Sequence, residues 1–277
     1  MGVILKKKKS RGARAVVTGA GGGIGRAFAL EVQRRGGRVV CSDIDMARAE
    51  QTAELIRQAG GSALAVACDV ADLEAVERLA EEAEQWFGLP ANLVINNAGV
   101  GAGGKLIGEI PMEDWQWIMG INLWGVIHGC HVFVPKLRVL GEGGVINVAS
   151  AASFGAAPMM AAYNTTKAGV LALSETLRAE VADTDITVTV LCPTFVKTDI
   201  IENSRMSGGR SAQQAKRFMA KKGFSPDEVV RKTLNEFDAG AIYVLPQLDA
   251  KVTWFMKRMA PGLFTRGMGV VGRFIRD

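Results

Sequence analysis

Short apolar runs alternate with longer amphipathic segments along most of the chain. The apolar runs, which predict strands, cover residues 13–18, 38–42, 62–67, 92–95, 144–149, 186–191 and 241–245. The amphipathic segments, which predict helices, cover residues 24–35, 46–59, 72–87, 113–140, 160–182 and 226–237. Runs that are apolar on both faces are typical of parallel strands covered by helices on both sides. The alternation predicts an α/β fold: a doubly wound parallel sheet in a three-layer α/β/α arrangement, built as a single domain.

The two ends of the chain differ in charge from its body. The net charge is +6 over residues 1–14 and +5 over residues 251–277, against +5 for the whole chain, so the middle is acidic. We interpret residues 1–13 as a basic N-terminal arm, residues 14–249 as the catalytic domain and residues 250–277 as a basic amphipathic C-terminal extension. Because the basic residues lie at the ends rather than on one face of the domain, we expect no nucleic-acid partner. The extension fits two roles, which are peripheral contact with a membrane and packing over a neighbouring subunit or the substrate mouth.

The cysteines and histidines favour neither a disulfide scaffold nor a metal site. The four cysteines form no CxxC pair and mostly sit in apolar runs, which is typical of buried reduced thiols. His128 and His131 are three residues apart on one predicted helix, but no third ligand is evident, so we expect no metal and a packing role. No run of about 18 apolar residues predicts a membrane span, and the first residues do not follow the order of a signal peptide. We therefore expect a cytoplasmic protein.

A glycine-rich loop follows the first predicted strand and opens the first predicted helix. It reads Thr-Gly-Ala-Gly-Gly-Gly-Ile-Gly over residues 18–25. Glycines let the backbone turn tightly and approach a pyrophosphate, and the helix N-terminus adds unpaired N–H groups. This context predicts a Rossmann fold with a dinucleotide held by Gly19, Gly22, Gly23, Ile24 and Gly25.

An acidic residue ends the second predicted strand at the place where a dinucleotide would present its adenosine ribose. Asp43 lies 18 residues after Gly25, and a carboxylate there accepts hydrogen bonds from ribose hydroxyls and repels a 2′-phosphate. Ile44, rather than an arginine, follows it. The pair favours NAD over NADP as the cofactor.

Tyr163 and Lys167 open a predicted helix and share one of its faces, because they are four residues apart. A free phenol has a pKa of about 10. An ammonium about 5 Å away favours the phenolate by about 3 kcal/mol at an effective dielectric constant of about 20, which brings the pKa towards neutral. Ser150, at the end of a predicted strand, can donate to a substrate oxygen, and Ser153 is its rival. This group predicts acid–base catalysis.

In these residues the chain resembles the short-chain dehydrogenase/reductase family, in its single-domain subfamily of about 250 residues. The resemblance runs from residue 14 to about residue 245. Its motifs are Thr18-Gly19-x-x-x-Gly23-x-Gly25, Asp69-Val70, Asn96-Asn97-Ala98-Gly99, Asn122, Ser150, Tyr163-x-x-x-Lys167 and residues 193–198.

The resemblance implies a role for each catalytic residue. Tyr163 would be the general acid/base, and Lys167 would lower its pKa and bind the nicotinamide ribose. Ser150 would bond the substrate oxygen. Asn122 would kink the long helix and hold a water that links Lys167 to solvent. The resemblance also implies a homodimer or homotetramer.

The resemblance further implies a set of cofactor contacts. Asp69 would contact the adenine amine, and Thr198 the carboxamide. Together with the glycine loop and Asp43, the implied cofactor residues are Ile44, Asp69, Val70, Asn97, Ala98, Gly99, Val148, Tyr163, Lys167, Pro193, Val196 and Thr198. The chain departs from the family pattern at Thr194, where glycine is usual, and at Thr166, where serine is usual.

The region around the predicted reacting group is apolar. Residues 151–160 are mostly alanine, methionine and phenylalanine, and residues 195–225 predict a lid. We expect an NAD-dependent oxidoreductase that interconverts a secondary alcohol and its ketone on a small hydrophobic substrate, which is steroid-, terpenoid-, aromatic- or lipid-like. An NADP-dependent ketoreductase and a non-catalytic dinucleotide sensor are the alternatives. The fold and its motifs name neither the substrate nor the direction of the reaction.

Overall fold

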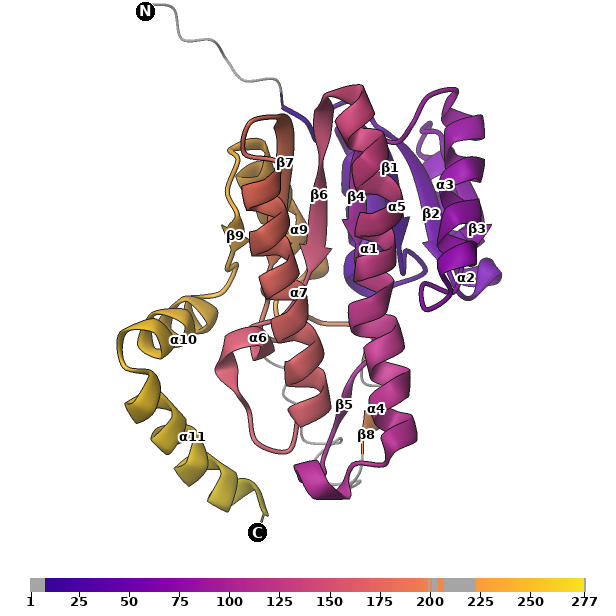
Figure 1. Ribbon diagram of the computed structural model, residues 1–277. Helices are drawn as coiled ribbons and strands as arrows, with labels where there is room; N and C mark the ends of the chain where they lie inside the picture. The colour runs from indigo at the N-terminus through magenta and orange to yellow at the C-terminus, as the bar shows by residue number, and fades with distance from the viewer. Residues whose placement is uncertain (1–7, 199, 201–203, 207–222, 277) are drawn as a thin grey trace, which may run out of the picture.

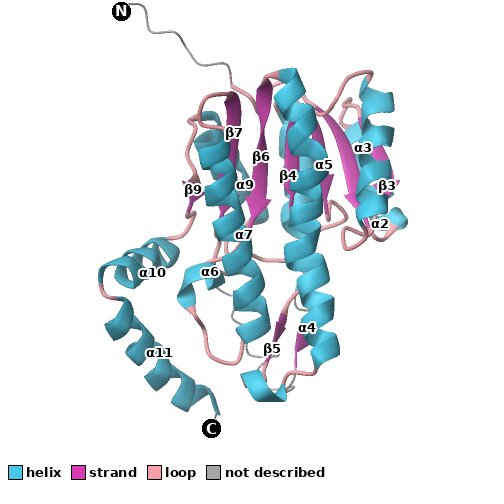
Figure 2. Ribbon diagram, in the orientation of Figure 1, coloured by secondary structure: helices cyan, strands magenta, loops and turns pink. Residues whose placement is uncertain are grey.

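A seven-stranded parallel sheet forms the centre of the molecule, with the strand order β3-β2-β1-β4-β6-β7-β9. The computed structural model describes residues 8–198, 200, 204–206 and 223–276. The strands are β1 Arg14–Thr18, β2 Arg38–Asp43, β3 Ala63–Ala67, β4 Leu93–Asn96, β6 Glu142–Val148, β7 Asp185–Leu191 and β9 Tyr243–Val244. Helices cover both faces, as Figures 1 and 2 show. The predicted doubly wound Rossmann fold is confirmed.

The helices divide into one set for each face of the sheet. They are α1 Gly23–Arg34, α2 Met46–Gln58, α3 Leu73–Phe87, α5 Gly125–Leu140, α7 Ala161–Glu180 and α9 Pro226–Asp238. Helices α1, α2 and α9 pack in one hydrophobic cluster, and α3, α5 and α7 contribute to two clusters on the opposite face. Strand β1 shows why both faces of the sheet are covered by apolar side chains. Ala15 and Val17 belong to the first cluster, whereas Val16 points to the opposite face.

The strand order reverses direction on either side of β1, which pairs in parallel with both β2 and β4. Chain connections leave β1 and β4 towards opposite sides of the sheet, so a crevice opens at the carboxyl ends of these strands. The glycine loop, the segment after β4 and the segment after β6 all leave the sheet at this edge. The predicted site residues therefore come together there.

The long predicted helix over residues 113–140 is interrupted. It consists of α4 Met112–Met119, a π-helical turn over Gly120–Trp124, and α5. Asn122, where the resemblance implies a kink, lies inside this turn, and π turns of this kind are frequent at functional sites. Although no membrane span is predicted from the sequence, Met112–Leu140 is long and apolar enough to cross a membrane. Its apolar character has a simpler cause, since Val126, Val134 and Leu137 pack under the sheet.

Three short elements beyond the carboxyl edge have no counterpart in the sequence prediction. They are β5 Ala102–Gly103, β8 Arg205–Met206 and α6 Ala152–Gly155. Strands β5 and β8 pair in parallel and lie below the main sheet in Figure 2. The predicted lid over residues 195–225 falls largely outside the described residues.

The C-terminal extension forms two helices, α10 Leu248–Met259 and α11 Pro261–Arg276. They follow the last strand of the sheet, β9, and run along the outside of the molecule towards the side where α6 lies (Figure 1). The break between them falls at Ala260, just before Pro261. Proline favours a helix start and cannot continue the preceding hydrogen-bond ladder.

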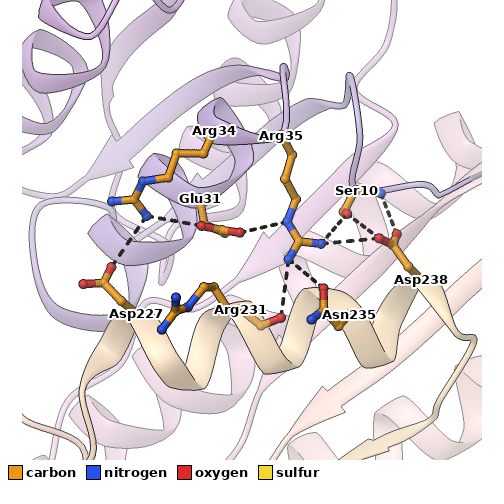
Figure 3. A network of polar contacts seen from close by, with 8 residues as sticks. All are labelled: Ser10, Glu31, Arg34, Arg35, Asp227, Arg231, Asn235 and Asp238. Atoms are coloured by element: carbon orange, nitrogen blue, oxygen red, sulfur yellow. Dashed lines mark hydrogen bonds and ion pairs between the residues drawn. The ribbon is translucent and has the colours of Figure 1, made fainter.

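A network of charged groups joins the described part of the N-terminal arm to α1 and α9 (Figure 3). Arg35 bonds Glu31 at 3.0 Å, Asp238 at 3.4 Å and Asn235 at 2.9 Å. Ser10 donates its hydroxyl to Asp238 at 2.6 Å and accepts from Arg35 at 2.9 Å. The side chains of Arg35 and Asp238 are 13% and 6% exposed. A buried ion pair of this kind is costly to break, because the remaining charge loses its partner.

We predict that Arg35→Ala lowers the free energy of unfolding by about 2–4 kcal/mol, because Asp238 and Glu31 lose a shielded partner. Arg34 is the matched control, since it is next in the chain and bonds Glu31 but is 52% exposed. Arg34→Ala should cost no more than about 1 kcal/mol. Urea unfolding of the two variants measures the difference, and equal losses would contradict this role of Arg35.

Candidate active site

The loop between β1 and α1 needs glycine at several positions. Gly19 and Gly23 have φ values of +63° and +52°, which place them in the left-handed region that side chains disfavour. A Cβ added to Gly25 would lie 2.1 Å from the Gly19 carbonyl oxygen. One added to Gly21 would lie 2.7 Å from Asp43 Oδ2. The backbone of the loop is therefore free of side chains where it leads into α1, whose first residue is Gly23.

Thr18 and Asn97 tie this loop to the turn after β4. Asn97 Nδ2 donates to the carbonyl oxygens of Thr18 at 2.8 Å and Gly19 at 3.2 Å. The backbone N–H groups of Asn97 and Ala98 donate to Thr18 Oγ1 at 3.0 and 3.1 Å. The side chain of Asn97, implied as a cofactor contact, therefore positions the glycine loop. Thr18 belongs to the family motif of the glycine loop, but the resemblance implied no role for its side chain.

Asp43 lies at the tip of β2, directly beside the glycine loop. Its Oδ2 accepts from the Gly21 N–H at 2.9 Å and its Oδ1 from the Asp45 N–H at 3.1 Å. Both contacts hold the half-buried carboxylate at the mouth of the loop. Ile44 next to it is 71% exposed.

Arg26 and Arg48 also flank this corner, and the sequence reasoning assigned neither a role here. Arg26 Nη2 donates to the Gly21 carbonyl at 2.6 Å, and its Nε donates to Thr52 Oγ1 at 3.0 Å. Its guanidinium is thus engaged in bracing the loop. The base of the Arg48 side chain lies close to the loop, because its Cβ is 2.7 Å from the position that a Cβ on Gly21 would take.

Asp69 and Val70 follow β3 on the adenine side of the predicted site. Asp69 is exposed, and its Oδ1 accepts from the Ala71 N–H at 2.9 Å. Val70 is buried, and its carbonyl accepts from His128 Nδ1 at 2.9 Å. This bond connects α5 to the segment after β3. No group of three metal-binding side chains occurs among the described residues.

Lys167 is buried at the carboxyl edge, one turn of α7 after Tyr163. Its Nζ donates to the Val148 carbonyl at 2.9 Å and lies 5.9 Å from the centre of the Tyr163 ring. The residue is 3% exposed, and burial lowers its pKa from 10.5 to about 8, with the nearby Cys192 acting in the opposite direction. The site therefore holds a cation that releases its proton more readily than a free lysine does.

The pKa of the Tyr163 hydroxyl shifts in the direction opposite to the one predicted. Burial raises its pKa above 10, a hydrogen bond with Ser150 lowers it, and Cys192 raises it. The net direction is opposite to the predicted lowering by Lys167. The physical reason is that burial removes both groups from water, while the Lys167 ammonium is directed at the Val148 carbonyl.

Of the two candidate serines, Ser150 is the one beside the phenol. Its Oγ accepts from the Ala152 N–H at 3.1 Å and lies 3.4 Å from the Pro193 carbonyl oxygen. Ser153 Oγ instead donates to the Lys167 carbonyl at 2.8 Å. Ser153 thus supports the α7 backbone, and Ser150 is the serine that can bond a substrate oxygen.

Asn122 is fully buried inside the π-helical turn. Its Oδ1 accepts from the Val100 N–H and its Nδ2 donates to the Val100 carbonyl, both at 2.8 Å. The amide thus holds the segment after Gly99 as a neighbouring strand would. A Cβ on Gly99 would lie 3.2 Å from Asn122 Oδ1 and 3.5 Å from Lys167 Nζ. The helix kink, the backbone turn and the buried ammonium therefore meet at one point.

The segment after β7 lies against the glycine loop. Thr198 Cγ2 would lie 2.9 Å from a Cβ on Gly23, and Val196 is buried. Thr194, where the family usually has glycine, donates its N–H to Gln247 Oε1 at 3.1 Å and its Oγ1 to Asp249 Oδ1 at 3.2 Å. The sequence did not indicate this link between the site and α10.

A small hollow lies next to the start of α7. Its lining is the apolar group Ala102, Gly103, Ile110, Met159, Met160, Ala161 and Ala162 together with the charged residues Lys105, Asp114 and Arg205. Arg205 bonds Asp114 at 2.8 Å and lies 4.3 Å from the centre of the Trp117 ring. The predicted apolar surroundings are thus joined by a charged rim.

Known proteins are similar to this chain in both sequence and fold. The profile of a family described as "short chain dehydrogenase" matches residues 13–207. A structure titled a short chain dehydrogenase/reductase from Burkholderia phymatum in complex with NAD superposes with a TM-score of 0.84 at 31% identity, covering 92% of this chain and 96% of that one. Cyclohexanol dehydrogenase from Acinetobacter sp. is 33% identical over 187 residues, covering 68% of this chain and 74% of the relative.

A longer relative matches over only part of its length. "Probable oxidoreductase EphD" from Mycobacterium tuberculosis is 38% identical over 223 residues, which cover 77% of this chain but 37% of that protein. The residues matched by the family profile include the glycine loop, the β4 turn and the start of α7. The chain therefore belongs to the short-chain dehydrogenase/reductase family of oxidoreductases.

Proposed function

We propose that the protein is an NAD-dependent oxidoreductase that interconverts a small hydrophobic secondary alcohol and its ketone. The observation that carries this proposal is the buried group at the carboxyl edge of the sheet. Lys167 is held by the Val148 carbonyl, one helical turn from Tyr163, and Ser150 bonds the Tyr163 hydroxyl. A phenol, an ammonium and a hydroxyl at one crevice can move a proton to or from a substrate oxygen.

The residues around the crevice fit a nicotinamide dinucleotide. A Cβ at Gly21 would collide with Asp43, and one at Gly25 would collide with the Gly19 carbonyl oxygen, so the tight turn of the loop requires glycine. The turn leads into a helix N-terminus suited to a pyrophosphate. Asp43 would hold the adenosine ribose, Asp69 the adenine, and Thr198 the carboxamide. Such a cofactor supplies hydride transfer, and a positive charge when it is oxidised.

The chain's own residues supply the proton chemistry. In the direction of alcohol oxidation, Tyr163 Oη would accept the hydroxyl proton of the substrate. Ser150 Oγ would hold the substrate oxygen at hydrogen-bond distance. Because burial keeps the pKa of Tyr163 above 10, the phenolate needs positive charge near it. Lys167 Nζ provides one such charge, and the bound nicotinamide would add another.

The contacts of Asp43 favour NAD over NADP. Two backbone N–H groups hold the carboxylate at the mouth of the loop, where it would accept from ribose hydroxyls and repel a 2′-phosphate. Arg26 is engaged with Gly21 and Thr52. Arg48, which begins at the same corner, is the observation that favours the alternative NADP-dependent ketoreductase.

The substrate class rests on the residues between Ser150 and Tyr163. Phe154 is buried and Met159 and Met160 line the hollow beside α7. The relative named cyclohexanol dehydrogenase supports an apolar alcohol. Because both Tyr163 and Lys167 are retained, we favour an enzyme over a dinucleotide sensor. Assembly as a homodimer or homotetramer and a cytoplasmic location stay predictions.

We predict that Tyr163→Phe lowers kcat by about 10²- to 10⁴-fold, because the variant loses its proton-transfer group. NADH binding, followed by fluorescence titration, should stay within about twofold. Tyr243→Phe is the matched control: Tyr243 is the other tyrosine of the chain, and its hydroxyl bonds Glu175 at 2.6 Å. A Tyr163→Phe enzyme that turns over apolar alcohols at the wild-type rate would refute the proposed mechanism.

Cofactor choice provides a second prediction. Asp43→Asn should lower the ratio of kcat/KM for NAD to that for NADP by about 10-fold or more, because an amide neither repels a phosphate nor makes charge-assisted bonds to the ribose. Asp45→Asn serves as the control, since Asp45 is exposed and caps α2. The assay follows NADH and NADPH absorbance. An unchanged ratio would show that Asp43 does not select the cofactor.

A further inference from the structure

Helix α10 presents an apolar stripe to the outside of the molecule. Positions 248, 252, 255, 256 and 259 fall on one helical face. The residues there are Leu248, Val252, Phe255, Met256 and Met259, each between 48% and 75% exposed. A surface helix normally buries such a face and exposes its polar one.

The orientation of α10 is fixed by its inner face. Ala250 is fully buried, and Trp254 packs against Phe154 of α6 at 5.1 Å and Tyr243 of β9 at 4.7 Å between ring centres. The Arg258 guanidinium lies 3.9 Å from the centre of the Trp254 ring. The apolar stripe therefore cannot turn inwards without breaking these contacts.

Helix α11 continues the exposed apolar surface and adds positive charge. Leu263, Val270 and Val271 are 71%, 52% and 45% exposed, and Arg266 and Arg273 are exposed as well. Over residues 248–276 the sequence contains six lysines and arginines against a single acidic residue, Asp249. The two helices thus combine exposed apolar side chains with a strong cationic excess.

We propose that α10 and α11 form a docking surface for an anionic lipid membrane. Apolar side chains would enter the boundary between headgroups and acyl chains, and the flanking cations would pair with anionic headgroups. A second copy of the chain is a poorer occupant. In a two-fold contact the same cations would face each other, whereas an anionic membrane complements their charge. The weak helix propensity of α11, which contains glycine at positions 262, 267, 269 and 272, also fits a helix stabilised by a surface.

The docking surface is connected to both sides of the active site. At its start, Gln247 and Asp249 accept hydrogen bonds from Thr194 in the segment after β7. Near its end, Gly272 packs against Pro158, since a Cβ there would lie 3.0 Å from Pro158 Cγ. Pro158 lies in the segment between Ser150 and Tyr163. Docking would therefore bring the substrate-facing segment next to the bilayer.

Co-sedimentation of the full-length protein with lipid vesicles tests the proposal. We expect binding to phosphatidylcholine–phosphatidylglycerol vesicles, weaker binding at high salt, and little binding to phosphatidylcholine alone. The triple variant Phe255→Ser/Met259→Ser/Leu263→Ser should bind at least about 10-fold more weakly, because three apolar side chains no longer enter the bilayer. The matched control replaces exposed apolar residues of the body, Leu89→Ser/Met112→Ser/Val139→Ser, and should bind as the wild type does.

Two outcomes would overturn the proposal. One is that both triple variants bind anionic vesicles as the wild type does. The other is that the wild type does not sediment with anionic vesicles at low salt; if light scattering then shows the docking-surface variant in a smaller assembly than the wild type, the surface is a contact between copies. Because Tyr163→Phe should sediment as the wild type does, the result is independent of the proposed reaction.

Discussion

The site depends on keeping the ammonium of Lys167 in a place that water does not reach. Burial shifts its pKa from 10.5 to about 8, a cost of about 3 kcal/mol at neutral pH. The Val148 carbonyl at the end of β6 accepts a hydrogen bond from the ammonium, and the Asn122 amide holds the neighbouring backbone at Val100. The chain thus tolerates a locally unfavourable charge at the point where the phenol of Tyr163 meets the crevice, which is typical of functional sites.

The parallel sheet makes this arrangement possible. Because all seven strands run the same way, their carboxyl ends deliver the glycine loop, the β4 turn and Ser150 to one edge. Hydrogen bonds from Asn97 to Thr18 and Gly19 then join the first two of these. Helix α7 rises from the same edge, so its first turn carries Tyr163 and its second carries Lys167. The start of α7 and the glycine loop are therefore attached to the same edge of one sheet.

Local sequence patterns were sufficient to predict the fold and which residues lie close together. They were not sufficient to predict the hydrogen-bond partners of each residue. Apolar runs such as Val16-Val17 identify buried strands, and the glycine loop can be recognised in the sequence by its glycines. The role of Asn97 in bracing the loop, the link from Thr194 to Gln247 and the raised pKa of Tyr163 depend on partners distant in sequence. Strand β8 and helix α6 were missed because elements this short carry no periodicity. The tail's amphipathic pattern was visible, whereas its outward apolar face depends on Trp254 packing against Phe154.

The pH dependence of stability tests the buried ammonium most directly. Since the folded pKa of about 8 lies below the unfolded value of 10.5, the unfolded chain holds the proton more tightly between these values, and stability rises with pH through that window. Urea unfolding of the protein and of Lys167→Met, without added cofactor, should show the wild type gaining about 2 kcal/mol relative to the variant from about pH 7 to pH 10. Curves that stay parallel across this range would contradict a buried, destabilised Lys167.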